Sequence, residues 1–160
     1  MLLIWILVIV FSVLRIAGAL GVQSLRSWRL CLRIALAAMF LVTASGHWGA
    51  RRADLIAMVP PLFPRPDLLV TITGILEIAG AIGLLIPRTA RLAAACLAVL
   101  LVAMFPANVY AAQHHLSIGG QAATALPLRT LIQMIVIAAA ASIAIGERRS
   151  HEAEVLSSGA

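Results

Sequence analysis

The sequence predicts an all-α integral membrane protein, and three observations carry that prediction. Of its 160 residues, 62% are hydrophobic and 11% are charged, and the mean hydropathy is +1.06, which is too apolar for one small soluble core. The apolar residues fall into five long runs. The twelve basic residues are all arginines and cluster at the ends of these runs. The net charge of +6 therefore reflects arginines that set the orientation of membrane spans, and not a nucleic-acid-binding face.

A transmembrane helix needs about 20 mostly apolar residues. Five segments meet this requirement, at 2–22, 30–46, 68–86, 91–112 and 126–146. We therefore divide the chain into an additional N-terminal transmembrane helix (1–25), a four-helix membrane domain (26–146) and a polar cytoplasmic tail that frays (147–160). Two alternatives stay open for the first segment. It could be a cleavable signal ending at Ala17-Gly-Ala19, although it lacks a basic region before the apolar run. Alternatively, the start codon could be wrongly assigned, in which case the protein is a four-helix core that begins at about Arg26.

The arginines predict the orientation, because short cytoplasmic loops are enriched in basic residues. Seven arginines lie in or beside the first and third connectors and after the last span, against four in or beside the second and fourth connectors. This places the N-terminus outside and the C-terminus inside. Arg15, within the first span, fits this orientation because its long side chain could reach the cytoplasmic face.

Glu77 is the only acidic residue inside the long apolar runs. A carboxyl group at bilayer depth is costly unless it is paired, protonated or facing a polar cavity, so Glu77 is a candidate functional residue. In the functional interpretation it binds or releases a proton, or accepts a hydrogen bond from a ligand such as a quinol hydroxyl group. In the structural interpretation it only pairs with Arg129 or His47 to fix the register of the helices.

Helical geometry predicts that the other buried polar groups lie near Glu77. With a rise of about 1.5 Å per residue, Glu77 lies about 13 Å inside its span, and Arg129 and Gln133 lie about 5 and 10 Å inside theirs, on one face. His47 and Asn108 lie near the same outer membrane face. We therefore expect one cluster in the outer half of the bundle, with Arg129 as the countercharge of Glu77 and the amides as orienting groups; its members are His47, Glu77, Asn108, Arg129 and Gln133.

Glycines flank the carboxyl group. Gly74, Gly80 and Gly83 share a three-residue spacing with Glu77, and a strip of small residues lets neighbouring backbones come close. Pro106, two residues before Asn108, predicts a kink that could open a pocket beside the amide. The connector 47–67 is rich in proline and apolar residues, so it is either a lid over the cluster or an interfacial segment without a gating role.

No metal site is expected. Cys31 and Cys96 are far apart, with no Cys-x-x-Cys pair and no nearby histidine to complete a ligand set. The adjacent His114 and His115 would point about 100° apart on a helix, so we expect interfacial hydrogen bonding from them. The sequence also has no dinucleotide motif, no haem-ligand pair placed across two spans and no redox cysteine pair. It therefore leaves open whether the chain is an enzyme, and the catalytic residues are unknown.

A series of short motifs resembles the DoxX family of small bacterial integral membrane proteins. The motifs occur in the family's order over about 30–146, and they are Ser45-Gly-His-Trp48, Met58-Val-Pro-Pro61, Ile72-Thr-Gly-Ile-Leu-Glu-Ile78, Gly83-Leu-Leu-Ile-Pro-Arg-Thr-Ala-Arg91, Phe105-Pro-Ala-Asn-Val-Tyr-Ala111 and Leu126-Pro-Leu-Arg-Thr-Leu-Ile-Gln133. The resemblance implies a DoxX-like four-helix bundle in the bacterial inner membrane, with the first span as an addition. It also implies that the five residues of the expected cluster occupy the family's recurrent polar positions.

The resemblance does not choose one function, because one fold serves several roles. Members of the family are linked to quinone-coupled sulfur oxidation, to quinol oxidase complexes and to oxidative-stress assemblies with soluble redox partners. Our leading hypothesis is a non-catalytic or ligand-binding subunit of a quinone-linked or redox-stress membrane complex, with quinone as the candidate cofactor and with the bilayer and redox proteins or a second copy as partners. The alternatives are a small proton-coupled carrier that uses Glu77, and an assembly factor or scaffold whose glycine strip binds partner helices.

Overall fold

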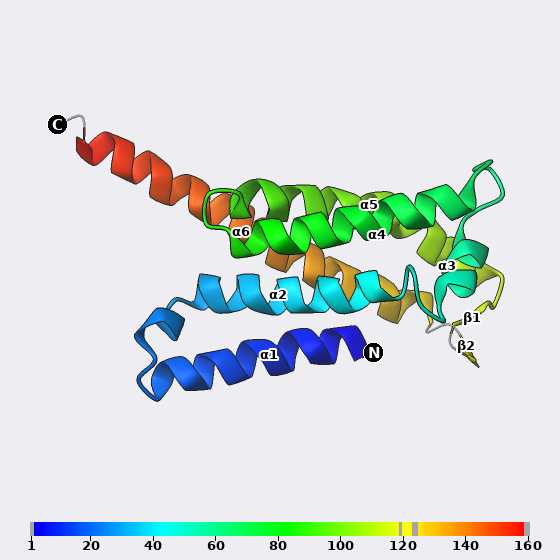
Figure 1. Cartoon of the computed structure of the whole chain (residues 1–160), viewed down its shortest axis with the longest axis horizontal. Helices are drawn as coiled ribbons and strands as arrows, with labels where there is room; N and C mark the ends of the chain where they lie inside the picture. Colours follow the sequence, from blue (N-terminus) through cyan, green and yellow to red (C-terminus); the bar gives the residue numbers. More distant parts are fainter. Residues whose placement is uncertain (1, 119, 123–124, 159–160) are drawn as a thin grey trace.

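The computed structural model describes residues 2–118, 120–122 and 125–158. Its regular secondary structure is helical apart from one very short hairpin, and turns and loops connect the helices (Figure 1). The α-helices are α1 (Leu2–Ala19), α2 (Trp28–Ser45), α3 (Arg52–Met58), α4 (Pro66–Leu85), α5 (Ala90–Gln113) and α6 (Leu126–Ser158), with a 3₁₀ turn, η1 (Gln23–Arg26), between the first two. Strands β1 (Ser117–Ile118) and β2 (Gln121–Ala122) pair antiparallel. The predicted all-α class is confirmed.

Four helices are long and apolar enough to cross a membrane. They are α2, α4, α5 and the first part of α6, from Leu126 to Gly146, and α1 adds a shorter apolar helix over Leu3–Ala19. The predicted spans agree with these bounds to within about three residues. By length and composition, the chain is therefore a multi-pass membrane protein whose outer surface contacts lipid.

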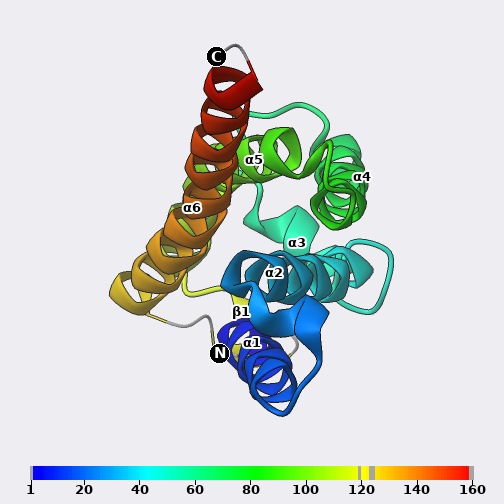
Figure 2. The ribbon, with the colours of Figure 1, turned by 90° about the vertical axis from the view of Figure 1, so that its left-hand side faces the viewer.

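The five apolar helices pack side by side, and their order decides which side chains can meet. Helix α5 packs between α4 and α6, α2 packs against α4, and α1 covers the outer side of α2 (Figure 2). The contact between α2 and α6 is small, and α4 and α6 share no substantial contact. Helices α4 and α6 therefore stand diagonally across the bundle.

Large apolar side chains fill the centre. Phe40 and Leu36 of α2, Leu84 of α4, Leu97 of α5 and Ile143 of α6 are fully buried. Leu7 of α1 joins the same cluster, which attaches α1 to the other helices through apolar contact.

Two arginines that we assigned to topology also donate hydrogen bonds to backbone carbonyl groups of other helices. Arg33 Nε donates to Leu84 O near the end of α4 at 2.7 Å, and Arg29 Nη1 donates to Gly146 O of α6 at 3.1 Å. The last carbonyl groups of a helix have no partner within the helix, so a cation beside them satisfies their hydrogen bonds. Arg33 thus caps the end of α4, whereas Arg29 binds a carbonyl group within α6.

Two local features differ from the expectation. The expected fraying after Gly146 is not observed, because α6 continues to Ser158 (Figure 1) through a segment that contains no proline. The short hairpin was not predicted; Gly120 supplies a positive φ of 76° in its turn, which glycine adopts at little cost.

Candidate functional site

The first buried polar group consists of His47, in the turn just after α2, and Glu77, in the middle of α4. Their side chains are 4% and 5% exposed, and His47 Nε2 lies 3.7 Å from Glu77 Oε2. Thr43, one turn earlier on α2, lies beside the same carboxyl group. Glu77 Oε2 is buried and has no hydrogen-bond partner among the described residues, so this carboxyl group retains unused hydrogen-bonding capacity.

The backbone fixes the orientation of the His47 ring. His47 Nδ1 lies 2.6 Å from Val70 O, and a carbonyl oxygen can only accept a hydrogen bond, so Nδ1 carries a proton. Nε2 then faces Glu77, either as a lone pair or as a second N–H group. The pair can therefore share one proton between an imidazole nitrogen and a carboxyl oxygen.

Gly74 brings α4 close enough for this contact. A Cβ atom added at Gly74 would lie 2.8 Å from His47 Cβ and from an atom of the Trp48 ring. Gly80 and Gly83 face Leu97 and Ala93 of α5 at comparable distances. The glycine strip is thus covered by neighbouring helices of the same chain, and it is not an open surface for a partner helix.

Arg52 ties the connector over this end of the bundle. From α3, its Nη1 donates to His47 O at 2.7 Å, and its Nη2 donates to Thr71 Oγ1 at 2.9 Å. Arg52 thereby joins the turn after α2 to the start of α4, through the backbone of His47 itself. The sequence alone did not single out Arg52, Val70 or Thr43, because a backbone carbonyl or a surface arginine leaves no distinctive pattern.

The second polar group lies between α5 and α6 and forms a chain of hydrogen bonds, in which Gln133 is buried and Asn108 and Arg129 are half-buried. Arg129 Nη1 donates to Asn108 Oδ1 at 3.2 Å, and Asn108 Nδ2 donates to Gln133 Oε1 at 3.1 Å. Gln133 Nε2 then donates to the backbone carbonyl of Leu101. We call these side chains the amide chain. Arg129 Nε is buried and has no acceptor among the described residues.

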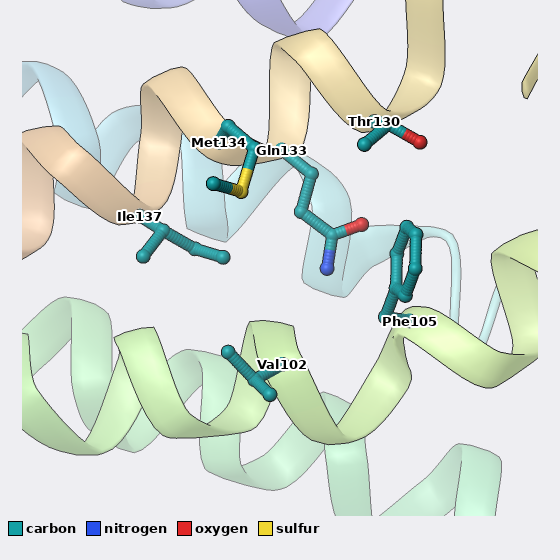
Figure 3. A pocket seen from close by; sticks show the side chains of 6 residues that line it. All are labelled: Val102, Phe105, Thr130, Gln133, Met134 and Ile137. Carbon is teal, nitrogen blue, oxygen red and sulfur yellow. The ribbon is translucent and has the colours of Figure 1, made fainter. Parts of the chain in front are cut away.

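An apolar pocket of about 210 Å³ adjoins the amide chain (Figure 3). Its lining comes from α5 and α6 and consists of Val102, Phe105, Thr130, Gln133, Met134 and Ile137. Val102 and Met134 are 58% and 60% exposed, and the exposed surface of these spans faces lipid, so the pocket opens sideways into the bilayer. Gln133 extends from α6 toward α5 (Figure 3), and Pro106, one residue after Phe105, leaves the Val102 carbonyl without its helical partner.

The structure therefore distributes the five predicted residues over two groups instead of one. The expected ion pair between Glu77 and Arg129 is absent from the described residues, where the group within salt-bridge distance of Glu77 is His47. The reason is the order of the helices: α4 and α6 are diagonal neighbours, separated by α5 (Figure 2). Depth along the membrane predicted the burial of His47, Glu77 and Gln133, whereas Asn108 and Arg129 are half-buried. Depth does not specify which of these side chains meet.

The remaining histidines lie outside both groups. His114, just after α5, packs against Tyr110 with ring centroids 4.2 Å apart and the rings tilted by 41°, and His115 has a positive φ of 49°. Among the described residues, no set of three or more His, Cys, Asp or Glu side chains could hold a metal ion. Cys31 is buried and Cys96 is exposed, and both are free thiols.

This fold and these two groups define a class: multi-pass helical membrane proteins with polar side chains buried between apolar spans. Residues 36–144 match the sequence model of a family described as a domain of unknown function (DUF8561), and the chain belongs to that family. The match starts within α2 and ends near the end of the fourth long apolar span. No curated protein and no solved structure shows significant similarity to this chain.

Proposed function

We propose that this protein is a DoxX-like bacterial inner-membrane protein, with its N-terminus outside, that serves as a non-catalytic, ligand-binding subunit of a quinone-linked or redox-stress membrane complex. The observation that carries this proposal is the apolar pocket between α5 and α6, which adjoins the amide chain and opens toward lipid. A quinone enters from the bilayer and combines an apolar tail with carbonyl groups that accept hydrogen bonds. An apolar pocket beside polar groups that fix the ligand's orientation is the usual form of such a site.

The size of the pocket favours one ring or one chain segment as its occupant. Its volume of about 210 Å³ is somewhat larger than the roughly 150 Å³ of an engineered apolar cavity that holds benzene. Two acyl chains of a phospholipid would not fit. Of the amide chain, Gln133 is the member that lines the pocket, and it connects the pocket to Asn108 and Arg129 through hydrogen bonds.

Native mass spectrometry of the gently solubilised protein tests this function. We expect a bound quinone-sized molecule in the wild type and its loss in Met134→Trp, because the larger side chain fills the pocket. Leu131→Trp is the matched control, since Leu131 is exposed on the same helix and does not line the pocket. A wild-type protein that retains neither a quinone-sized molecule nor a redox-protein partner would contradict the proposal.

A second candidate is a small proton-coupled carrier, and one observation favours it: the buried Glu77 oxygen without a hydrogen-bond partner. A single ionisable group inside a span is typical of proton relays in transporters. This function predicts pH-dependent flux in proteoliposomes that is lost in Glu77→Gln. Flux that is unchanged in Glu77→Gln would exclude this role for the carboxyl group.

A further inference from the structure

The chain turns from α1 into α2 through η1, and this turn holds two arginines at one end of the bundle (Figure 1). We call residues 15–28 the α1–η1 corner. Arg15 lies inside the apolar helix α1, one turn before its end, and its Nη1 donates to the backbone carbonyl of Arg26 in η1 at 2.7 Å. A Cβ atom added at Gly18 would collide with the Leu25 carbonyl, so α1 and η1 are in direct contact. The Arg15 side chain therefore extends from the span to the membrane surface, as long basic side chains near span ends do.

The charges of these two arginines have no carboxylate beside them. Within the described residues, the Arg26 side chain has no hydrogen-bond or ion-pair partner, and the Arg15 side chain has only the Arg26 carbonyl. Both side chains are exposed, and the sequence from 1 to 53 contains no Asp or Glu. Exposed guanidinium groups suit a phosphate ligand, because each presents several N–H donors in a planar fork.

The surroundings of the corner match a lipid head group above an acyl chain. Trp28 is 46% exposed at the start of α2, and exposed tryptophans are typical of the membrane–water interface. Val8 lies seven residues before Arg15, hence on the same face of α1 and about 10 Å deeper, and it is also 46% exposed. An apolar surface thus runs from Arg15 toward the membrane centre, which a phospholipid covers and a free phosphate ion does not.

We infer that the α1–η1 corner binds an anionic phospholipid, with Arg15 and Arg26 contacting its phosphate and one acyl chain lying along Val8. The inference is independent of the proposed function, because no residue that lines the α5–α6 pocket belongs to α1 or η1. Orientation in the membrane explains arginines at the end of a span, but it requires neither an arginine inside the span nor its attachment to a backbone carbonyl. A head group with net negative charge is favoured over a zwitterionic one, because basic side chains at the membrane surface attract anionic lipids.

Native mass spectrometry of the full chain in micelles, titrated with phosphatidylglycerol or with phosphatidylcholine of the same acyl chains, tests this inference. We expect the wild type to bind phosphatidylglycerol about tenfold more tightly, and Arg26→Gln to reduce that preference about fivefold, the contribution of one basic residue at an anionic membrane surface. Arg88→Gln is the matched control and should keep the preference within about twofold, because Arg88 is an exposed arginine at the same end of the bundle, in the turn after α4 (Figure 1).

Arg26→Gln is the principal variant because it removes no side-chain bond among the described residues, whereas Arg15→Gln also removes the bond to the Arg26 carbonyl. Arg15→Lys keeps the positive charge and should retain the preference. Equal binding of the two lipids by the wild type would overturn the inference, and so would an equal loss in Arg88→Gln and Arg26→Gln, which would show a diffuse effect of charge. Displacement of phosphatidylglycerol by an equal concentration of inorganic phosphate would also overturn it, because the ligand would then be a free anion.

Discussion

The two polar groups of this bundle, one buried and one partly buried, use their hydrogen bonds in opposite ways. Between α2 and α4, the acid Glu77 meets a base, His47, and an oxygen is left without a partner. Between α5 and α6, the cation Arg129 donates to a neutral amide, Asn108, and its Nε–H group has no acceptor among the described residues. The difference teaches that adjacency of helices selects the partner of a buried charge, even where residues of opposite charge are expected at similar depth.

The largest expected effect is a loss of stability when each polar group is disrupted in turn. His47→Leu leaves the Glu77 carboxyl group buried without its partner and should lower the free energy of unfolding by about 3 kcal/mol. Asn108→Leu interrupts the amide chain and should cost only about 1 kcal/mol, as is usual for hydrogen bonds between membrane helices. Unfolding by SDS in mixed micelles measures both. A larger loss of unfolding free energy in Asn108→Leu than in His47→Leu would show that the amide chain, and not the His47–Glu77 pair, contributes more to stability.

A second prediction concerns the interface that joins the two groups. A Cβ atom at Gly83 would lie 2.7 Å from Ala93 Cβ, and a Cβ atom cannot move without its backbone, so Gly83→Val should push α4 from α5. Overpacking of this kind costs about 1–3 kcal/mol, read from the same SDS titration. Ile82→Val is the control, because Ile82 is exposed on the neighbouring position; equal stability of the two variants would show that the helices are not in close contact there.

The third prediction concerns the connector above the His47–Glu77 pair. Arg52→Ala removes the hydrogen bonds from α3 to His47 O and Thr71 Oγ1. It should lower the free energy of unfolding by about 1 kcal/mol, because hydrogen bonds from a charged group make a net contribution to stability of this order. Hydrogen exchange over 47–67 should become faster. Arg51→Ala is the matched control, because Arg51 is exposed. Exchange that increases equally in both variants would mean that Arg52 does not tie the connector.

The smallest expected effect is an absence of coupling between the two groups. In a double-mutant cycle, Glu77→Leu and Arg129→Leu should add within about 0.5 kcal/mol, as expected for side chains that share no partner. The cycle of Glu77→Leu with His47→Leu should instead give a coupling of about 0.5–3 kcal/mol. A strong coupling between Glu77 and Arg129 would restore the single cluster predicted from depth.

The sequence predicted most of the fold and the members of both groups, but not the pairing. The spans follow from hydropathy, and the burial of Glu77, Gln133 and His47 follows from their positions along those spans. The pairing depends on the order of helices around the bundle, which local sequence does not encode. The Leu101 and Val70 carbonyls are also invisible to such reasoning, because every residue carries one, and only the packed structure shows which of them meets a side chain.

Photolabelling with an azido-quinone tests the central claim most directly, because it reports where a quinone lies in the bundle. With the full chain in nanodiscs, we predict that the label attaches to residues of the α5–α6 pocket such as Val102, Phe105 or Met134. The label should persist in Glu77→Leu and disappear in Met134→Trp. Attachment to α2 or α4 around His47 and Glu77 would contradict the account and move the ligand to the other polar group.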